Sequence, residues 1–225
     1  MQLLKKGSTG ILVTYLQKKL DIAQTSIFDD ATDTKVKEFQ ENKGLVADGK
    51  VGGNTWTAVY LDKEKPRNTT SKLDRHNNIM HLHPVVRTAV VKTFVQLQAE
   101  GIPFKIFEAF RYPERQADLY AQGRTKPGSI VTYAKPWSSY HQYGLAVDFV
   151  LYINDSWSWE TGAAKAAWWK RLHTVGQEEG LMRLDFEAPH LQLAGTSSSA
   201  LKQGVYPANG DQSWYDNFMN ARKSI

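Results

Sequence analysis

The stretch from Gly144 to Ile153 reads GLAVDFVLYI, an apolar run that contains a single charge, Asp148. This composition predicts a strand that is buried on at least one face. A buried carboxylate without a partner costs several kcal/mol, so Asp148 requires a cation or hydrogen-bond donors. Two explanations are open from the residues alone: an ion pair with an arginine such as Arg111, or a bound metal ion.

A histidine upstream of this strand favours the metal. His141 lies seven residues before Asp148, in the segment SYHQYGLAVD. Gly144 lies between them and can turn the chain, so that a loop histidine and a strand aspartate reach one point.

A third candidate segment is DFEAPHLQL, residues 185–193, in which Glu187 and His190 are three residues apart. Pro189 excludes a helix interior there, and in a straight strand residues three apart face opposite ways. A bend at Pro189 would bring both side chains to one site; without it, they are an ordinary surface glutamate and a strand histidine.

Together these segments supply the residues of a catalytic zinc site. His141, Asp148 and His190 offer three nitrogen or oxygen ligands, and Glu187 offers a carboxylate that can take a proton from water. The chain has no cysteine, so a zinc site built from thiolates is excluded.

The patterns along the chain predict an α+β fold, with a small, mainly antiparallel sheet flanked by helices. Helices are expected over residues 84–100, 113–122 and 163–179, and strands over 102–107, 144–153 and 190–193. The C-terminal segment, residues 212–225, is expected to dock as an amphipathic helix.

Residues 1–62 are expected to form a separate domain of three short helices. The second helix should begin near Asp30 or Thr32 as N-cap, and the third at Asn54 or Thr55. Residues 63–76 are polar, contain Pro66 and predict a linker, so that residues 77–225 form the second domain. The alternative is that residues 63–76 are a surface loop inside a single domain.

The composition limits the class of protein and the partners. Of the 225 residues, 41% are hydrophobic and 23% charged, which is ordinary for a globular protein. The net charge of +5 favours an anionic partner, either nucleic acid or a wall polymer. The chain lacks the interleaved aromatic and basic residues of single-strand binders, so we expect no nucleic acid. No apolar run approaches the ~20 residues of a membrane helix, so we expect no stable membrane insertion, and we expect a monomer.

The candidate ligands lie in motifs that resemble a known family. Residues 139–148 fit the pattern S-x-H-x-x-G-x-A-x-D, and residues 187–190, EAPH, fit the pattern (E/D)-x-x-H. The pair resembles the zinc peptidases that cut D-alanyl-D-alanine or L-alanyl-D-glutamate bonds in peptidoglycan. Residues 110–128 resemble the segment upstream of the zinc motif in the L-alanyl-D-glutamate branch. The resemblance covers about residues 77–193.

The first domain resembles the common peptidoglycan-binding module. The matching segments are residues 4–10, 16–17, 36 with 39–40, 44–45 and 48–56. Two wall-directed modules in one chain reinforce each other.

The resemblance implies a role for each residue of the site. It implies one zinc ion held by His141, Asp148 and His190, with Glu187 as the catalytic base. It further implies Arg111 near the scissile carbonyl, and Gln116 and Ser139 in the substrate site. Three departures concern the choice of bond: glutamate at 187 where aspartate is frequent, leucine at 191 where an aromatic is frequent, and an unusual segment over 180–185.

The resemblance therefore implies a cell-wall hydrolase, most directly an L-alanyl-D-glutamate endopeptidase of the bacteriophage endolysin type. The N-terminus lacks an apolar stretch long enough for a signal peptide. We expect synthesis in the host cytoplasm without a signal peptide, and action on the wall after release. Two alternatives remain: a D-alanyl-D-alanine carboxypeptidase on the same scaffold, and a non-catalytic wall-binding protein.

Four tryptophans lie close together in sequence, at positions 157, 159, 168 and 169. They could bind sugar or peptide, but aromatic residues at strand or helix spacing usually belong to the core. We interpret most of this run as core.

Overall fold

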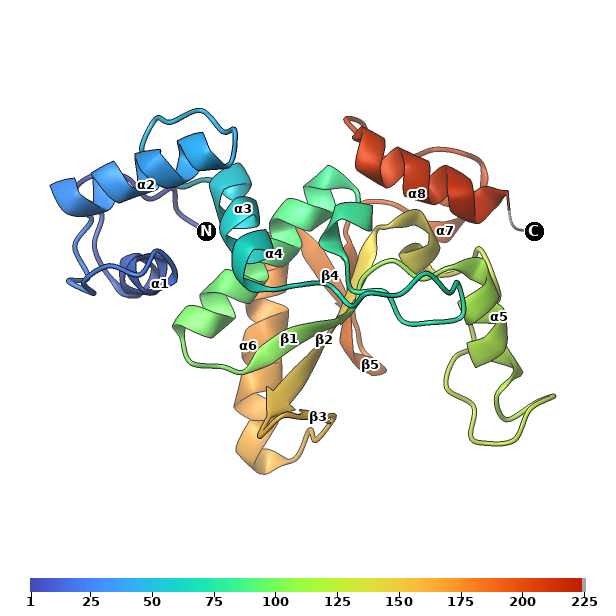
Figure 1. Ribbon diagram of the computed structural model, residues 1–225. Helices are drawn as coiled ribbons and strands as arrows, with labels where there is room; N and C mark the ends of the chain where they lie inside the picture. Colours follow the sequence, from blue (N-terminus) through green and yellow to red (C-terminus); the bar gives the residue numbers. More distant parts are fainter. Residues whose placement is uncertain (224–225) are drawn as a thin grey trace.

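The computed structural model describes residues 1–223, which form a helical N-terminal part followed by an α+β part (Figure 1). The α+β fold expected from the sequence is confirmed. Within residues 1–223, no helix has the length and apolar character that crossing a membrane requires.

The N-terminal part contains α1 (Ile11–Lys19), α2 (Asp30–Asn42) and α3 (Gly53–Lys63). The N-cap of α2 is Asp29, not Asp30 or Thr32, because the Asp29 carboxylate accepts a hydrogen bond from the Thr32 backbone amide at 2.8 Å. Gly44 follows α2 with a φ of 67°, the left-handed conformation in which many helices end. The third helix also begins slightly earlier than the predicted Asn54.

One five-stranded sheet forms the centre of the second part, and all its pairings are antiparallel. Its strands are β1 (Phe104–Glu108), β2 (Ala146–Ile153), β3 (Ser156–Ser158), β4 (Leu181–Leu184) and β5 (Glu187–Leu193). The order is β1-β2-β5-β4, and β3 pairs with the end of β2. The three predicted strands correspond to β1, β2 and β5. The other two are too short to show a period of their own.

Two long helices, α4 (Pro84–Ala99) and α6 (Ala163–Glu178), pack on each other and against the sheet (Figure 1). Pro84 stands in the first turn of α4, where its missing N–H costs nothing. Phe104 of β1 meets Trp169 of α6 edge to face, with ring centroids 4.8 Å apart. These contacts bury the face of the sheet that carries Phe149 and Leu151.

The remaining elements are α5 (Pro113–Ala121), α7 (Ser198–Lys202), α8 (Gln212–Arg222) and the 3₁₀ turns η1 (Ile79–His81) and η2 (Tyr140–Tyr143). The C-terminal helix docks as expected: Trp214 donates from Nε1 to the Tyr143 carbonyl at 2.8 Å, and Phe218 is 2% exposed. Residues 224–225 of the predicted C-terminal segment lie outside the described residues.

Two of the N-terminal helices, α1 and α3, pack directly on α4. Tyr60 of α3 meets Phe94 of α4 edge to face, with ring centroids 5.0 Å apart, and both rings are buried. Gly53 lies so close to Thr88 that a Cβ at Gly53 would be 2.7 Å from the Thr88 methyl carbon. The boundaries 1–62, 63–76 and 77–225 stay predictions, but the parts they separate share an apolar contact.

Removing residues 1–62 is therefore expected to destabilise the rest of the chain. Phe94 would lose Tyr60 and become exposed, and exposing a side chain of this size costs about 1.5–3 kcal/mol. For a domain of this size, that corresponds to a Tm lowered by about 3–12 °C. Scanning calorimetry of the full chain and of residues 63–225 measures the difference, and an unchanged Tm would contradict the contact.

Candidate metal centre

The candidate site lies where β2 and β5 pair. Asp148 of β2 stands directly opposite His190 of β5 in the antiparallel register. Residues that face each other across such a ladder project from the same side of the sheet. The pairing of two strands distant in sequence thus brings a carboxylate and an imidazole together.

The turn η2 supplies His141. Its N-terminus is fixed by a capping box, in which the Ser139 hydroxyl accepts from the backbone of the turn and Gln142 reaches back to the Ser139 amide. Gly144 ends the turn with a φ of 66°, and a Cβ there would lie 2.7 Å from the carbonyl oxygen of His81. Only glycine fits this position, from which the chain enters β2.

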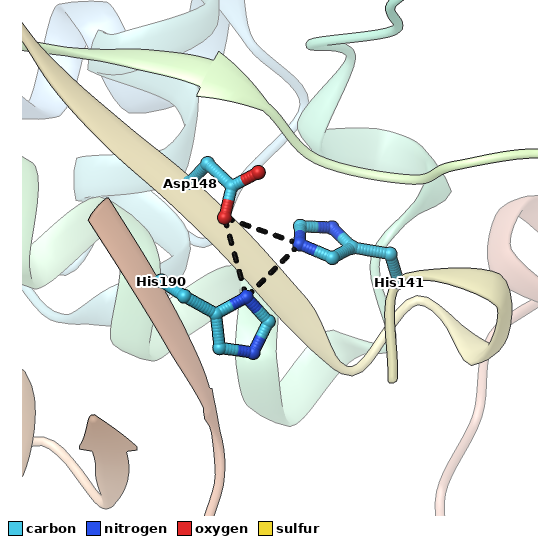
Figure 2. A group of neighbouring side chains, drawn as sticks. All are labelled: His141, Asp148 and His190. Atoms are coloured by element: carbon cyan, nitrogen blue, oxygen red, sulfur yellow. Dashed lines mark hydrogen bonds and ion pairs between the residues drawn. The ribbon is translucent and has the colours of Figure 1, made fainter. Parts of the chain in front are cut away.

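The donor atoms of the three predicted ligands converge on one point (Figure 2). Asp148 Oδ1 lies 3.2 Å from His141 Nε2 and 3.2 Å from His190 Nδ1, and the two nitrogens are 3.2 Å apart. All three side chains are buried. The three predicted ligands thus lie together in the structure, and the cluster can hold a metal ion.

The hydrogen bonds of both imidazoles suit a cation at this point. His141 Nδ1 lies 2.6 Å from the Ala109 carbonyl oxygen, and His190 Nε2 lies 3.0 Å from Gln192 Oε1. Both partners are acceptors, so each neutral ring donates there through its protonated nitrogen. The unprotonated nitrogen of each ring then directs its lone pair toward Asp148. Three acceptors then face one another without a proton. A tetrahedral zinc ion with bonds of about 2.0–2.1 Å separates its ligand atoms by about 3.3–3.4 Å, close to the observed spacing.

The charges around the cluster keep Asp148 ionised. Burial alone would raise the pKa of its carboxyl, but His141, His190 and Arg111 outweigh burial and hold that pKa well below its ordinary value. Burial would lower the pKa of His190, but hydrogen bonding to Asp148 and the Asp148 charge outweigh it, so this pKa is raised. A proton and a metal ion would compete for the same lone pair of His190.

Arg111 is held by three side chains. Its Nε and Nη2 donate to Glu108 Oε2 at 3.0 and 2.7 Å, its Nη2 also donates to Asp148 Oδ2 at 3.0 Å, and its Nη1 donates to Gln116 Oε1 at 3.1 Å. Glu108 is 2% exposed and also accepts from Arg115. The predicted ion pair with Arg111 is therefore present at Asp148 Oδ2, while Asp148 Oδ1 faces the two histidines of the cluster that can hold a metal ion.

Glu187 shares a cavity with the cluster because the ladder between β4 and β5 is irregular. Arg183 faces Leu191, so in a regular ladder Leu184 would face His190; instead it faces Glu187. Residues 188–190 of β5, which include Pro189, therefore lie between two successive pairs of the β4–β5 ladder. The register shift thus falls where the sequence predicted a bend, and Glu187 and His190 line the same cavity.

This cavity has a volume of about 660 Å³. His141, His190, Arg111 and Glu187 line it, and so does Ser139, whose role in binding substrate stays a prediction. Two strongly exposed rings line it as well, Tyr133 at 81% and Phe186 at 83% exposure.

Gln116 has a different position from the one expected. It is fully buried, and it accepts from Arg111 and from Gln142 while donating to the Ala134 carbonyl. A side chain enclosed in this way orients Arg111 from behind and has no surface free to line the cavity.

Comparison with known proteins identifies the family. The profile of a family described as D-alanyl-D-alanine carboxypeptidase matches residues 79–193, about half of the chain. The chain belongs to this family. A second profile, described as a putative peptidoglycan binding domain, matches residues 9–59. The chain is thus a modular peptidase directed at peptidoglycan.

Two individual proteins resemble this peptidase. The peptidoglycan L-alanyl-D-glutamate endopeptidase CwlK of Bacillus subtilis (strain 168) is 38% identical over 122 residues, which cover 50% of this chain and 73% of CwlK. The crystal structure of a Burkholderia AP3 phage endolysin aligns with 99% of this chain and 84% of that chain, at 21% identity and a TM-score of 0.27.

Sequence reasoning missed two side chains that support the site of the peptidase. Gln192 lies two residues after His190, so strand alternation alone places both on one face of β5. Glu108 lies one residue beyond the predicted strand over 102–107, and its role depends on Arg111 and Arg115, which only the fold brings to it.

Proposed function

We propose that this chain is a zinc-dependent L-alanyl-D-glutamate endopeptidase that degrades bacterial walls as an endolysin. The observation that carries the proposal is the convergence of three buried donor atoms beside a cavity that also contains Glu187. Two imidazoles, one carboxylate and an open position are the donor set of catalytic zinc. The activity for which CwlK is named supports the choice of bond.

Each residue of the site has a proposed role. His141, Asp148 and His190 would hold one zinc ion, which when bound supplies a Lewis acid that makes water a nucleophile at neutral pH. Glu187 takes a proton from the attacking water and returns it to the leaving amine. Arg111 stabilises the negative charge that develops on the scissile carbonyl oxygen. Ser139 contacts the substrate from the cavity wall, and Gln116 orients Arg111.

The residues around Arg111 favour the positively charged form of its guanidinium. Burial would lower the pKa of its guanidinium, but Glu108 and Asp148 outweigh burial and raise this pKa. The guanidinium therefore stays charged throughout the range in which proteins function, and its direction is fixed by the hydrogen bonds to Glu108 and Gln116.

Replacing Glu108 by glutamine is expected to lower kcat by about 100-fold, because a small misplacement of a catalytic group has an effect of this size. Glu108→Gln keeps the shape of the side chain but removes the charge that holds Arg111. Steady-state kinetics with a soluble stem peptide measures kcat and KM separately, and circular dichroism verifies folding. A correctly folded variant with unchanged kcat would rule out this support of Arg111.

The bond that is cut distinguishes the proposal from its nearest alternative. The family description favours a D-alanyl-D-alanine carboxypeptidase, which trims terminal residues and leaves the crosslinked wall intact. We expect mass spectrometry of digested muropeptides to show stem peptides that begin with D-glutamate. Release of D-alanine alone would support the carboxypeptidase instead.

A chelator distinguishes the enzyme from a non-catalytic wall-binding protein. Purified walls should lose turbidity in the presence of the chain, a chelator should stop this loss, and added zinc should restore it. Loss of turbidity that persists at full rate after complete removal of metal would contradict the proposed zinc dependence.

The N-terminal module would hold the enzyme on insoluble wall, which raises its concentration near the substrate without any new catalytic contact. The match of residues 9–59 to a peptidoglycan-binding profile supports this role. We retain residues 1–62 as the wall-binding domain, 63–76 as linker and 77–225 as the peptidase domain. We further propose that the chain is a monomer and binds no nucleic acid. It would be made in the host cytoplasm and act on the wall after release.

A further inference from the structure

The tryptophan run of the sequence divides into two groups in the fold. Trp169 of α6 is 4% exposed and belongs to the core, and Trp168 is partly buried against the same core cluster. Trp157 and Trp159 instead lie on the other side of the sheet, and Trp159 is 51% exposed. The expectation that most of the run is core thus holds for α6 only.

The two surface tryptophans form a continuous row of rings with Phe107 and Tyr152, which we call the aromatic strip. Phe107 meets Trp157 and Trp159 edge to face, with centroids 5.0 and 5.2 Å apart. Tyr152 meets Trp157 in the same way at 5.0 Å. Phe107, Tyr152 and Trp157 are half-buried and Trp159 is exposed, so the strip presents adjoining aromatic rings to a binding partner.

The aromatic strip lies on the same face of the sheet as the candidate metal centre. Asp148 and Tyr152 are four residues apart in β2, so their side chains project to the same side. Trp157 stands directly opposite Tyr152 in the β2–β3 ladder and shares this face. At about 3.3 Å per residue, the strip begins ~13 Å from Asp148.

Two cations accompany the aromatic strip. The Arg75 guanidinium lies 3.9 Å from the ring centroid of Phe107 and 5.1 Å from that of Trp157. The Lys105 ammonium lies 4.5 Å from the centroid of Tyr152. These cations lie over the faces of Phe107, Trp157 and Tyr152, so the surface offers the exposed ring of Trp159 next to positive charge. This arrangement complements a polymer of sugar rings whose attached peptides carry carboxylates.

We propose that the aromatic strip binds the glycan strand of peptidoglycan while the cavity takes the attached stem peptide. Sugar rings have apolar C–H faces that can stack on aromatic side chains, much as nucleic-acid bases do. This inference rests on the proposed function. In an L-alanyl-D-glutamate substrate, one alanine and one lactyl group connect the scissile bond to the sugar, ~7 Å of chain at 3.3–3.6 Å per residue. The glycan strand continues from that sugar, and its following sugar rings can reach the aromatic strip.

The experiment compares two soluble substrates with the full chain. One is a short glycan strand that carries stem peptides, and the other is the same stem peptide without sugar. We expect Trp159→Ala to lower the ratio of kcat/KM for the first over the second by about fivefold, the effect of one aromatic contact. Tyr215→Ala is the matched control, because Tyr215 is 49% exposed on α8, far from β3 in Figure 1, and it should leave the ratio unchanged.

Direct binding provides a second measurement that does not depend on cleavage. Glycan strands stripped of stem peptides should bind the parent chain and bind Trp159→Ala and Lys105→Glu more weakly. Equal binding of all three chains, an unchanged substrate ratio, or a preference for a phosphate-bearing wall polymer would overturn the proposal. If the parent chain cut neither substrate but still bound stripped strands through Trp159, the proposed function would fail and the glycan surface would stand.

Discussion

His190→Ala is expected to abolish metal binding and, with it, peptidoglycan cleavage. His190 contributes one of three donor atoms that lie 3.2 Å apart, and its Nδ1 lone pair faces the centre of the cluster. Loss of an outer partner of a metal ligand already lowers metal affinity by about 10–100-fold, so loss of a ligand itself should exceed this range. Elemental analysis of the purified variant and turbidity loss of walls measure the two effects.

A second histidine of the same part of the chain is a suitable control. His173 of α6 lies outside the cluster, where its Nε2 contacts the Ala188 carbonyl at 2.8 Å. We expect His173→Ala to keep metal and activity. If His190→Ala retained one metal ion per chain with full activity, while circular dichroism showed both variants folded, the ion would have to bind elsewhere.

Acidification is expected to reproduce the His190→Ala defect reversibly. The pKa of His190 is raised by Asp148, so a proton competes for Nδ1 at a higher pH than at an ordinary histidine of pKa about 6.5. Since the protonated ring cannot bind metal, affinity for the ion is complete above this raised pKa and falls as the pH drops through it.

The ligands could be predicted from the sequence because a charged residue within an apolar, buried segment requires a partner. Asp148 is the single charged residue in a run of apolar side chains, and His141 precedes it by one glycine-containing turn. The helices could be predicted for similar local reasons, such as Pro84 at the start of α4. What sequence did not settle was whether Asp148 binds Arg111 or a metal, because a carboxylate has two oxygens and only the fold assigns a partner to each.

The remaining features depend on contacts between distant segments. The four residues of β4 show no clear alternation, and their strand exists because β5 pairs with them. Gln116 matched a substrate-site position by resemblance, yet its burial behind Arg111 follows from how α5 and η2 pack. The surface tryptophans and those of α6 looked alike in sequence, since exposure is decided by which face of the sheet a ring occupies.

Replacing Glu187 by glutamine is expected to separate metal binding from catalysis. The side chain lines the same cavity as His141 and His190 but is not one of the three converging donors. Glu187→Gln should therefore keep the metal content of the parent chain. It should also lower kcat by about 10²–10⁴-fold, because an amide cannot take the proton of the attacking water.

The size and origin of that loss can be tested against a conservative variant. Aspartate keeps the carboxylate on a side chain one methylene shorter, so Glu187→Asp should recover part of the activity that Glu187→Gln loses. If Glu187 is the proton acceptor, both variants keep full metal content, Glu187→Asp keeps partial activity and Glu187→Gln keeps almost none. A residue that merely shapes the cavity would not give this pattern. Near-parental wall hydrolysis by the metal-loaded Glu187→Gln chain would show that another group takes the proton, and Asp148 is too firmly held by Arg111 and the histidines to be that group.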